Sequence, residues 1–385
     1  MDAPFLEDSL SREGCCSDLK TLAIIVNYKS FPLTLQAVKS VLESESYGPV
    51  RVVVVDNSSD PHESHRLRSN LPSSVILQVN KENRGFGSAC NQAFEAFESD
   101  GILLINPDAR LWPGCLKQLQ KTLFFSRNVA AVSPQLFWDD DQFFYLPPPY
   151  PIALFEFRTL LATWGSEAWI NRFLSFLWRR RSIRLWRSET AVEVSNLSGG
   201  LVLLNRAAVQ KAGGLFDPRF FLYFEDTDLF LRLKKIGFRL LIEPRARAVH
   251  YYDQCGRRQL QEKRRLMAKS HTLFLEKHKK ASKTALKKFL ERSFRPFMDH
   301  KSLNLPVFQS PFSIKVPPRF QNEWLFEWSP NPDLIPSAAQ FGAGPEMRFP
   351  ETCWKLFSPG QYFGRLGGTN YFGTSFQKVS WIINS

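Results

Sequence analysis

Short apolar segments that end in polar residues recur along the first third of the chain. They lie at residues 22–27, 50–56, 75–79, 102–106 and 129–133. Between them, residues 33–44 and 88–97 carry apolar side chains at helical spacing. Buried strands that alternate with helices are typical of a doubly wound, mostly parallel sheet. We therefore predict an α/β fold for this part of the chain.

Polar residues follow three of these predicted strands directly. Asn27 and Tyr28 close the first strand, Asp56 closes the second, and Asn106-Pro-Asp108 closes the fourth. The carboxyl ends of parallel strands meet at one edge of a sheet, where α/β proteins bind their ligands. A carboxylate such as Asp108 can hold a divalent cation against a diphosphate there, and Asp56 can accept hydrogen bonds from a ribose or base. Ordinary turn residues would explain the same pattern.

A glycine turn precedes the helix predicted at 88–97. It begins at Asn83 and continues through Gly85 and Phe86. Glycine lets the backbone approach a ligand closely, and the start of a helix favours anions. The turn is therefore a candidate phosphate contact. Its spacing differs from the dinucleotide fingerprint, so a hydride-transfer site is not supported.

A second acidic site follows the apolar residues 220–224. Glu225 and Asp226 come next, Asp228 follows, and residues 229–236 have helical spacing. These acids thus stand at the start of a helix, where the helix dipole favours the ionised form. An ionised carboxylate there can accept a proton from a substrate hydroxyl. A helix cap is the plainer interpretation, but a cap needs only one acid.

His250 closes the last predicted strand of this region, at 246–250. A single His in that position is usually structural. It could instead supply the neutral nitrogen ligand of a cation that Asp108 holds.

Taken in order, the motifs resemble those of the family 2 glycosyltransferases, within them the rhamnosyltransferase-like branch. The resemblance covers about residues 20–255. Its motifs are Asn-Tyr at 27–28, Val-Asp-Asn-Ser-Ser at 55–59, Asn-Arg-Gly-Phe-Gly at 83–87, Ala-Cys-Asn at 89–91, Asn-Pro-Asp at 106–108, Ser-Gly-Gly at 198–200, Gly-Gly-Leu-Phe-Asp at 213–217, Phe-Glu-Asp-Thr-Asp-Leu at 224–229 and His250.

The resemblance implies a GT-A fold, a nucleotide diphosphate sugar donor (dTDP-rhamnose, or a UDP- or GDP-sugar), a Mg or Mn cation and inversion at the anomeric carbon. It implies donor contacts from Asn27, Tyr28, Asp56, Asn83, Gly85, Phe86, Asn91 and Asn106. The metal ligands would be Asp108 and His250, and the general base would be Asp226 with Glu225 beside it. The acceptor would lie among Ser198, Gly199, Gly200 and Phe224.

The charge distribution adds a possible membrane contact. The formal net charge is +13, and the excess of Lys and Arg is concentrated in 172–187 and 257–301. Both segments have helical, amphipathic spacing, so we expect them on an anionic membrane surface. For 172–187, a helix that covers a protein core and exposes its arginines fits equally well. No recognition motif accompanies the charge, so nucleic acid is not an expected partner.

Other features suggest a cytosolic setting. The six Cys have no metal-site spacing, which indicates reduced thiols. The first residues lack the apolar core of a signal peptide, and no run approaches the roughly 20 apolar residues that span a bilayer. We therefore expect a cytoplasmic protein, peripheral on the inner face of the cell membrane.

These patterns also predict the domain organisation. It comprises an N-terminal tail at 1–18, a GT-A domain at 19–255 with a Trp- and Arg-rich insert at 142–190, a basic helical segment at 256–302, and a small β-sandwich at 303–385 that weakly resembles a fibronectin type III module.

The expected activity is that of a metal-dependent inverting glycosyltransferase. It would move rhamnose or a similar deoxyhexose to a hydroxyl of a cell-surface polysaccharide or lipid-linked glycan. The alternative is a catalytically inactive protein that binds a nucleotide sugar or a glycan. All the expected acids are present, which favours the enzyme.

Overall fold

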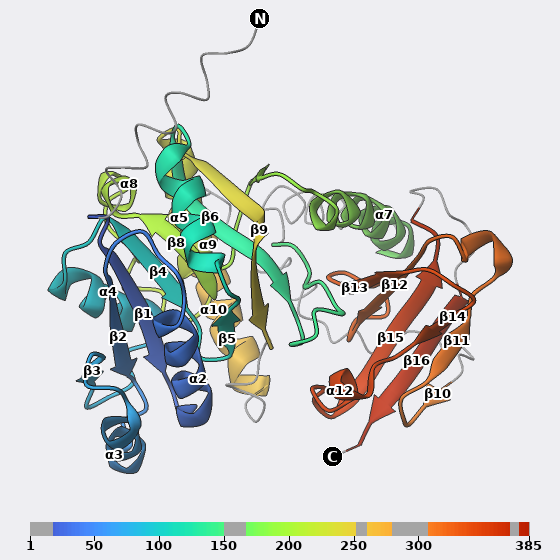
Figure 1. The fold of residues 1–385 in the computed structure, drawn as a ribbon, viewed down its shortest axis with the longest axis horizontal. Helices are drawn as coiled ribbons and strands as arrows, with labels where there is room; N and C mark the ends of the chain where they lie inside the picture. The colour runs from blue at the N-terminus through green and yellow to red at the C-terminus, as the bar shows by residue number, and fades with distance from the viewer. Residues whose placement is uncertain (1–17, 150–166, 252–259, 279–306, 370–376, 385) are drawn as a thin grey trace, which may run out of the picture. The chain divides into compact units, whose positions relative to one another are not determined.

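The computed structural model describes residues 18–149, 167–251, 260–278, 307–369 and 377–384 (Figure 1). The chain divides into two compact units. The first comprises residues 1–135 and 189–282, and the second comprises residues 136–188 and 283–385. Of the Trp- and Arg-rich segment 142–190, which we predicted as an insert of the GT-A domain, the described residues 142–149 and 167–188 fall in the second unit.

The first unit contains one large mixed sheet. Its strands, in spatial order, are β3 (Ile76–Val79), β2 (Val50–Asp56), β1 (Thr21–Asn27), β4 (Gly101–Ile105), β8 (Leu201–Asn205), β6 (Val129–Phe137), β9 (Arg239–His250) and β5 (Ala109–Leu111), with β7 (Val192–Val194) paired to β9. The strands from β3 to β4 run parallel, and β8 turns the sheet antiparallel. All seven residues of β1 are buried, so both faces of the sheet are covered there. The predicted α/β sheet is confirmed.

The helices of the first unit include some that the sequence pattern did not predict. The helices are α2 (Phe31–Leu42), α3 (Pro61–Asn70), α4 (Phe86–Ala96), α5 (Cys115–Phe125), α8 (Arg206–Lys211), α9 (Glu225–Lys235) and α10 (Leu260–His278). Helix α3 was missed because it is mostly polar. Its start is nevertheless marked: Asp60 accepts a hydrogen bond from the backbone N–H of His62 at 2.9 Å, and Pro61 follows the cap.

Strand register positions the polar strand ends. Asn27 on β1 lies opposite Asp56 on β2, and Ala109 on β5 lies opposite His250 on β9. Asp108 precedes Ala109 directly, so this second pairing brings an acid and a histidine together from distant parts of the sequence.

The second unit combines a long helix with small sheets. Its elements are α7 (Glu167–Trp186), β10 (Val307–Phe308), β11 (Ser313–Lys315), η2 (Pro318–Phe320), β12 (Trp324–Ser329), β13 (Ala338–Gly342), β14 (Glu346–Arg348), α12 (Glu351–Trp354), β15 (Gly360–Gly367) and β16 (Gln377–Ile383). A five-stranded sheet runs in the order β10-β16-β15-β12-β13, and β11 pairs with β14. Phe326 and Trp381 of the larger sheet share one core with Ile314 and Met347 of the smaller sheet. The predicted small β structure is confirmed, and its likeness to fibronectin type III stays a prediction.

Both described amphipathic helices bury several large apolar side chains in protein. On α7, Trp178 and Trp186 are buried. On α10, Phe274 and Leu275 are only 4% and 8% exposed. These four side chains have protein partners and are not available to lipid, and the membrane contact that we predicted for these helices stays a prediction. For α7 the core-covering interpretation holds, and most of 257–301 lies outside the described residues.

Among the described residues, no helix is long and apolar enough to cross a bilayer.

A buried charge cluster fixes α7 within the second unit. The Glu327 carboxylate on β12 is fully buried, and it accepts hydrogen bonds from Arg179 of α7 at 2.8 Å and from Arg365 of β15 at 2.8 and 2.9 Å. Arg179 also donates to the carbonyl of Gly368 at 2.6 Å. The cluster joins three elements that are far apart in the sequence.

We expect Glu327→Gln to lower the free energy of unfolding by about 3–5 kcal/mol, because both guanidinium groups would stay buried without a counter-charge. Urea unfolding followed by tryptophan fluorescence measures the change. Glu346→Gln is the control, since its partner Arg348 is exposed and such pairs contribute little. Equal stability of the two variants would contradict the role of Glu327 as the counter-charge of two buried guanidinium groups.

Candidate active site

The ends of β1 and β2 are held together by side-chain hydrogen bonds. Asn27 donates to Oδ1 of Asp56 at 3.0 Å, and Ser64 donates to Oδ2 at 2.5 Å. The backbone N–H of Ser58 donates to Oδ1 at 3.1 Å. Asn27 and Asp56 are fully buried. These contacts favour a positioning role for both residues at the sheet edge, and a direct contact of Asp56 with a nucleotide stays a prediction.

Asn57 connects this edge to the glycine turn, a role that sequence reasoning missed. Its amide donates to Oδ1 of Asn83 at 2.8 Å and to the carbonyl of Gly85 at 3.2 Å. Its oxygen accepts from Asn80 and from the backbone N–H of Arg84, each at 3.1 Å. An Asn just after a buried strand is a typical turn-forming residue, and that signal could have identified it.

Asp108 and His250 form the predicted pair. His250 Nε2 lies 3.2 Å from Oδ1 of Asp108, and both side chains are buried. Within the described part of the chain, no group of three or more His, Cys, Asp and Glu side chains could hold a metal. Mg²⁺ commonly takes one or two carboxylates and completes its shell with substrate phosphates and water. A carboxylate with one imidazole therefore fits a cation that is shared with a diphosphate.

The Ser198–Gly200 turn lies between this pair and Asp226. The N–H of Gly199 donates to Oδ2 of Asp226 at 2.9 Å. A Cβ on Gly200 would lie 2.8 Å from Cε1 of His250 and 3.0 Å from Nδ2 of Asn106. The backbone N–H of Asn106 also donates to the carbonyl of Gly200 at 2.7 Å. Gly199 thus contacts the predicted base Asp226, and Gly200 lies against His250 and Asn106 of the predicted metal and donor sites.

Gly200→Ala tests this crowding. The added methyl would displace His250 or Asn106, and we expect Mn²⁺-dependent nucleotide binding to weaken about 10- to 100-fold. Titration calorimetry of a nucleoside diphosphate in the presence of Mn²⁺ measures the loss. Gly101→Ala is the control: its Cβ would also be crowded, 3.2 Å from Phe124, but not by these residues. Similar binding by both variants would contradict the placement of Gly200.

Asp226 and Glu225 begin α9 but have different surroundings. Asp226 is half-buried and accepts from Gly199 and from the backbone N–H of Thr227 at 2.6 Å. Burial raises the pKa of Asp226, and these hydrogen bonds oppose the rise. Glu225 is 5% exposed, and burial together with the Asp226 charge raises its pKa well above the usual range. The Cβ of Glu225 lies near Gly87, whereas Asp226 lies beside Gly199, so Asp226 is the acid that contacts the Ser198–Gly200 turn.

The segment before Asp226 contacts the 83–87 turn. The backbone N–H of Phe86 donates to the carbonyl of Phe221 at 3.0 Å. Gly85 has a φ of 79°, and a Cβ there would lie 2.3 Å from the same carbonyl oxygen, so only glycine fits. The predicted phosphate turn at 83–87 and the apolar segment at 220–224 are thus neighbours.

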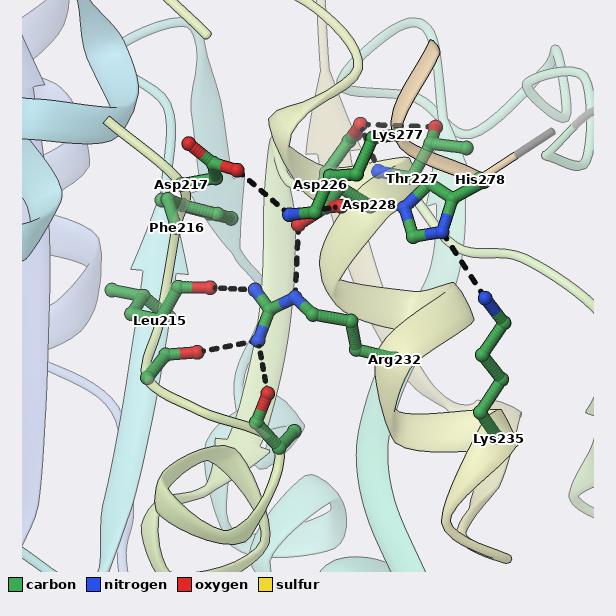
Figure 2. Close-up of polar contacts among 12 residues, drawn as sticks. Leu215, Phe216, Asp217, Asp226, Thr227, Asp228, Arg232, Lys235, Lys277 and His278 are labelled. Carbon is green, nitrogen blue, oxygen red and sulfur yellow. Dashed lines mark hydrogen bonds and ion pairs between the residues drawn. The ribbon is translucent and has the colours of Figure 1, made fainter. Parts of the chain in front are cut away.

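Asn91 supports a neighbouring loop, and the donor contact that we predicted for it stays a prediction. Its amide donates to the carbonyl of Phe216 at 2.8 Å, and its oxygen accepts from the N–H of Phe216 at 3.0 Å. Both ends of the amide therefore support the 213–217 loop. The same loop receives Arg232 of α9, which donates to the carbonyls of Ala212, Gly214 and Leu215 (Figure 2).

The remaining predicted residues lie around these contacts. Ser198 accepts from the N–H of Gly200 at 3.2 Å. Tyr28 is half-buried beside the cation of Lys29, at 5.8 Å. Phe224 caps α9 in the left-handed conformation, and its ring faces α10.

Comparisons with known proteins cover much of this region. Residues 22–208 match the model of a family described as Glycosyl transferase family 2. Over 217 residues the chain is 29% identical to an N-acetylglucosaminyl-diphospho-decaprenol L-rhamnosyltransferase of Mycobacterium tuberculosis (strain H37Rv), covering 53% of this chain and 67% of the relative. The family match includes Asp56 and Asp108 and ends before Asp226 and His250.

Solved structures also match, among them two that contain Mn²⁺. A mannosyltransferase, PcManGT from Pyrobaculum calidifontis in complex with GDP-Man and Mn²⁺, has a TM-score of 0.45 at 16% identity, covering 75% of this chain and 77% of that chain. A crystal structure of GalNAc-T7 with UDP, GalNAc and Mn²⁺ has a TM-score of 0.48 at 16% identity, covering 71% of this chain and 54% of that chain. This chain thus spans about half the length of the latter protein.

Proposed function

Since this chain belongs to the family 2 glycosyltransferases, we propose that it moves rhamnose or a similar deoxyhexose from a nucleotide diphosphate donor to a glycan hydroxyl. The acceptor would be a growing cell-surface polysaccharide or a lipid-linked glycan. The similarity to the mycobacterial relative, a rhamnosyltransferase with a lipid-linked sugar in its name, supports this choice.

One observation carries the proposal. The Gly199–Gly200 turn contacts Asp226 on one side and His250 on the other, and His250 lies beside Asp108. An acid that can accept a proton and a pair that can hold a cation therefore flank one short turn. A sugar transfer needs both groups near the anomeric carbon and its leaving diphosphate.

The reaction is a single displacement. The acceptor oxygen forms a bond to the anomeric carbon while the bond from that carbon to the diphosphate oxygen breaks, which inverts the configuration. Asp226 accepts the proton of the attacking hydroxyl, and the electron pair of the broken bond leaves on the nucleoside diphosphate. Asp108 and His250 would hold Mg²⁺ or Mn²⁺, which when bound offsets the negative charge of the diphosphate.

The donor contacts follow from the sheet edge. We assign the nucleotide to the edge formed by Asn27, Tyr28 and Asp56, and its phosphates to the turn at Asn83–Phe86, which Asn57 holds against that edge. Backbone groups in a glycine turn at the start of α4 suit an anion. dTDP-rhamnose, a UDP-sugar and a GDP-sugar are the candidate donors.

The proposed location is the cytoplasmic face of a membrane, because the proposed acceptor carries a lipid and would lie in a membrane. We expect a lipid contact to use exposed basic side chains such as Arg180 and Arg184.

A thermal-shift screen tests the donor class. UDP, GDP and dTDP are each added with and without Mn²⁺, and we expect one of them to raise the Tm only when Mn²⁺ is present. The corresponding nucleotide sugar should then be hydrolysed slowly by the wild type. Stabilisation without any hydrolysis or transfer would instead support the inactive binding protein. No stabilisation by any nucleotide would overturn the proposed function.

A further inference from the structure

Helix α10 packs on the segment that leads into Asp226. The hydroxyl of Ser270 donates to the carbonyl of Leu222 at 2.7 Å. The ring of Phe224 lies 5.1 Å from the ring of His271 and 5.6 Å from that of Phe274, measured between centroids. Residues one helical turn apart on α10 therefore enclose the turn before α9.

This turn has an unfavourable backbone conformation. Tyr223 and Phe224 have φ angles of 70° and 67°, in the left-handed region that bulky residues rarely adopt. Such residues persist only where surrounding contacts hold them, and they are concentrated at functional sites. Asp226 follows two residues later, so its position depends on what holds this turn.

Lys277 ties α10 to both sides of the turn. Its ammonium group lies 2.7 Å from Oδ2 of Asp217 and 2.7 Å from Oδ1 of Asp228 (Figure 2). Asp228 is fully buried on the first turn of α9, and Arg232 contacts its other oxygen at 2.9 Å. Burial would raise the pKa of Asp228, but hydrogen bonds from Lys277, His278 and Arg232 outweigh burial and lower it. Asp228 is thus an ionised anchor.

His278 completes the attachment as a neutral donor. Its Nε2 lies 2.6 Å from Oδ1 of Asp228, and its Nδ1 lies 3.2 Å from the ammonium of Lys235 (Figure 2). A lysine ammonium can only donate, so Nδ1 accepts and Nε2 carries the proton. Burial lowers the pKa of His278, in agreement with the neutral form. This tautomer can donate to Asp228 and accept from Lys235 at the same time.

We propose that Lys277 and His278 are positioning residues for sugar transfer. Through Asp228 and Asp217 they fix the first turn of α9, and with it the carboxylate of Asp226. Neither residue need touch the substrate. The inference depends on the function proposed above, because it assigns these residues an effect on the base of that reaction.

Single variants measure the size of the effect. We expect Lys277→Met to lower kcat by about 100-fold through displacement of Asp226, while the Kd of the nucleoside diphosphate with Mn²⁺ stays unchanged. Lys277→Arg should restore most of the activity, since it keeps a cation between the two acids. Lys269→Met is the control, because Lys269 is exposed on the same helix.

His278 provides an independent pair of variants. His278→Gln keeps a donor near Nε2 and an acceptor for Lys235, so it should retain most activity, whereas His278→Leu should lose as much as Lys277→Met. If Lys277→Met fails to fold, the two His278 variants still compare a side chain that keeps the contact with Asp228 with one that removes it. Equal activity of His278→Gln and His278→Leu would overturn the assignment of His278.

A double-mutant cycle separates positioning from general stability. When Asp226 is already Asn, Lys277→Met should cost little further activity, because both changes act on one group. An equal fold-loss in both backgrounds, or a Lys277→Met variant as active as Lys269→Met, would overturn the inference while the proposed function stands. A wild type that transfers no sugar would overturn both.

Discussion

Asp226→Asn should lower kcat for sugar transfer by about 10²–10⁴-fold and leave nucleotide affinity unchanged. The amide keeps the shape and one of the two backbone hydrogen bonds, from Gly199 or from Thr227, but it cannot take the proton from the attacking hydroxyl. Steady-state transfer kinetics, with donor binding measured separately, give both values.

Glu225→Gln is the matched control for this variant. Glu225 is adjacent to Asp226 but buried, and its raised pKa favours the neutral acid that Gln resembles. It should therefore retain far more activity. A Glu225→Gln variant as inactive as Asp226→Asn would move the base to Glu225, and full activity of Asp226→Asn would remove the base assignment.

The pH dependence provides a second check on Asp226. The base works only when ionised, so activity should fall as pH drops through its pKa. Burial raises that pKa, and the fall should begin at a higher pH than for an exposed aspartate, whose pKa is about 3.9. The pH profile of kcat/KM reports this value for the free enzyme. A profile that stays flat down to the ordinary aspartate range would contradict the assignment.

The second large effect is expected at the cation pair. Asp108→Asn should lower kcat/KM by about 10³-fold or more, because charge on the leaving diphosphate would lose several kcal/mol of stabilisation. The nucleoside diphosphate should also lose its Mn²⁺-dependent rise in Tm. In the wild type, a chelator should remove activity and added Mn²⁺ should restore it.

Asp100→Asn is the control for Asp108. Asp100 is exposed and lies just before β4, whereas Asp108 lies beyond the other end of that strand. Charge removal at Asp100 should leave activity and Mn²⁺ dependence unchanged. If Asp108→Asn keeps a Mn²⁺-dependent rise in Tm equal to that of the wild type, Asp108 does not hold the cation.

Much of the sheet and the approach of distant acids could be predicted from the sequence. Runs such as 50–56 are rich in Val and buried, which indicates strands whose ends share one edge. The pairing of Asp108 with His250 was expected from the family pattern, and the register of β5 with β9 supplies the physical reason.

Other features depend on tertiary partners that a local pattern does not specify. Asn91 was expected at the donor from the family pattern, whereas its hydrogen bonds to Phe216 join residues 125 positions apart and could not be predicted from the sequence. Helix α10 has an apolar face, but periodicity does not tell whether lipid or protein covers it. The roles of Lys277 and His278 were missed for the same reason, since their acidic partners lie about 50 to 60 residues away.

In the second unit, α7 is synthesised well before the strands on which it packs. Arg179 and its partner Glu327 are separated by 148 residues, and Trp186 packs on Leu325 across a similar interval. A ribosome therefore releases α7 long before the strands that cover its apolar face exist. During that interval the nascent chain would present exposed tryptophans to chaperones, and premature termination after α10 would leave a protein prone to aggregation.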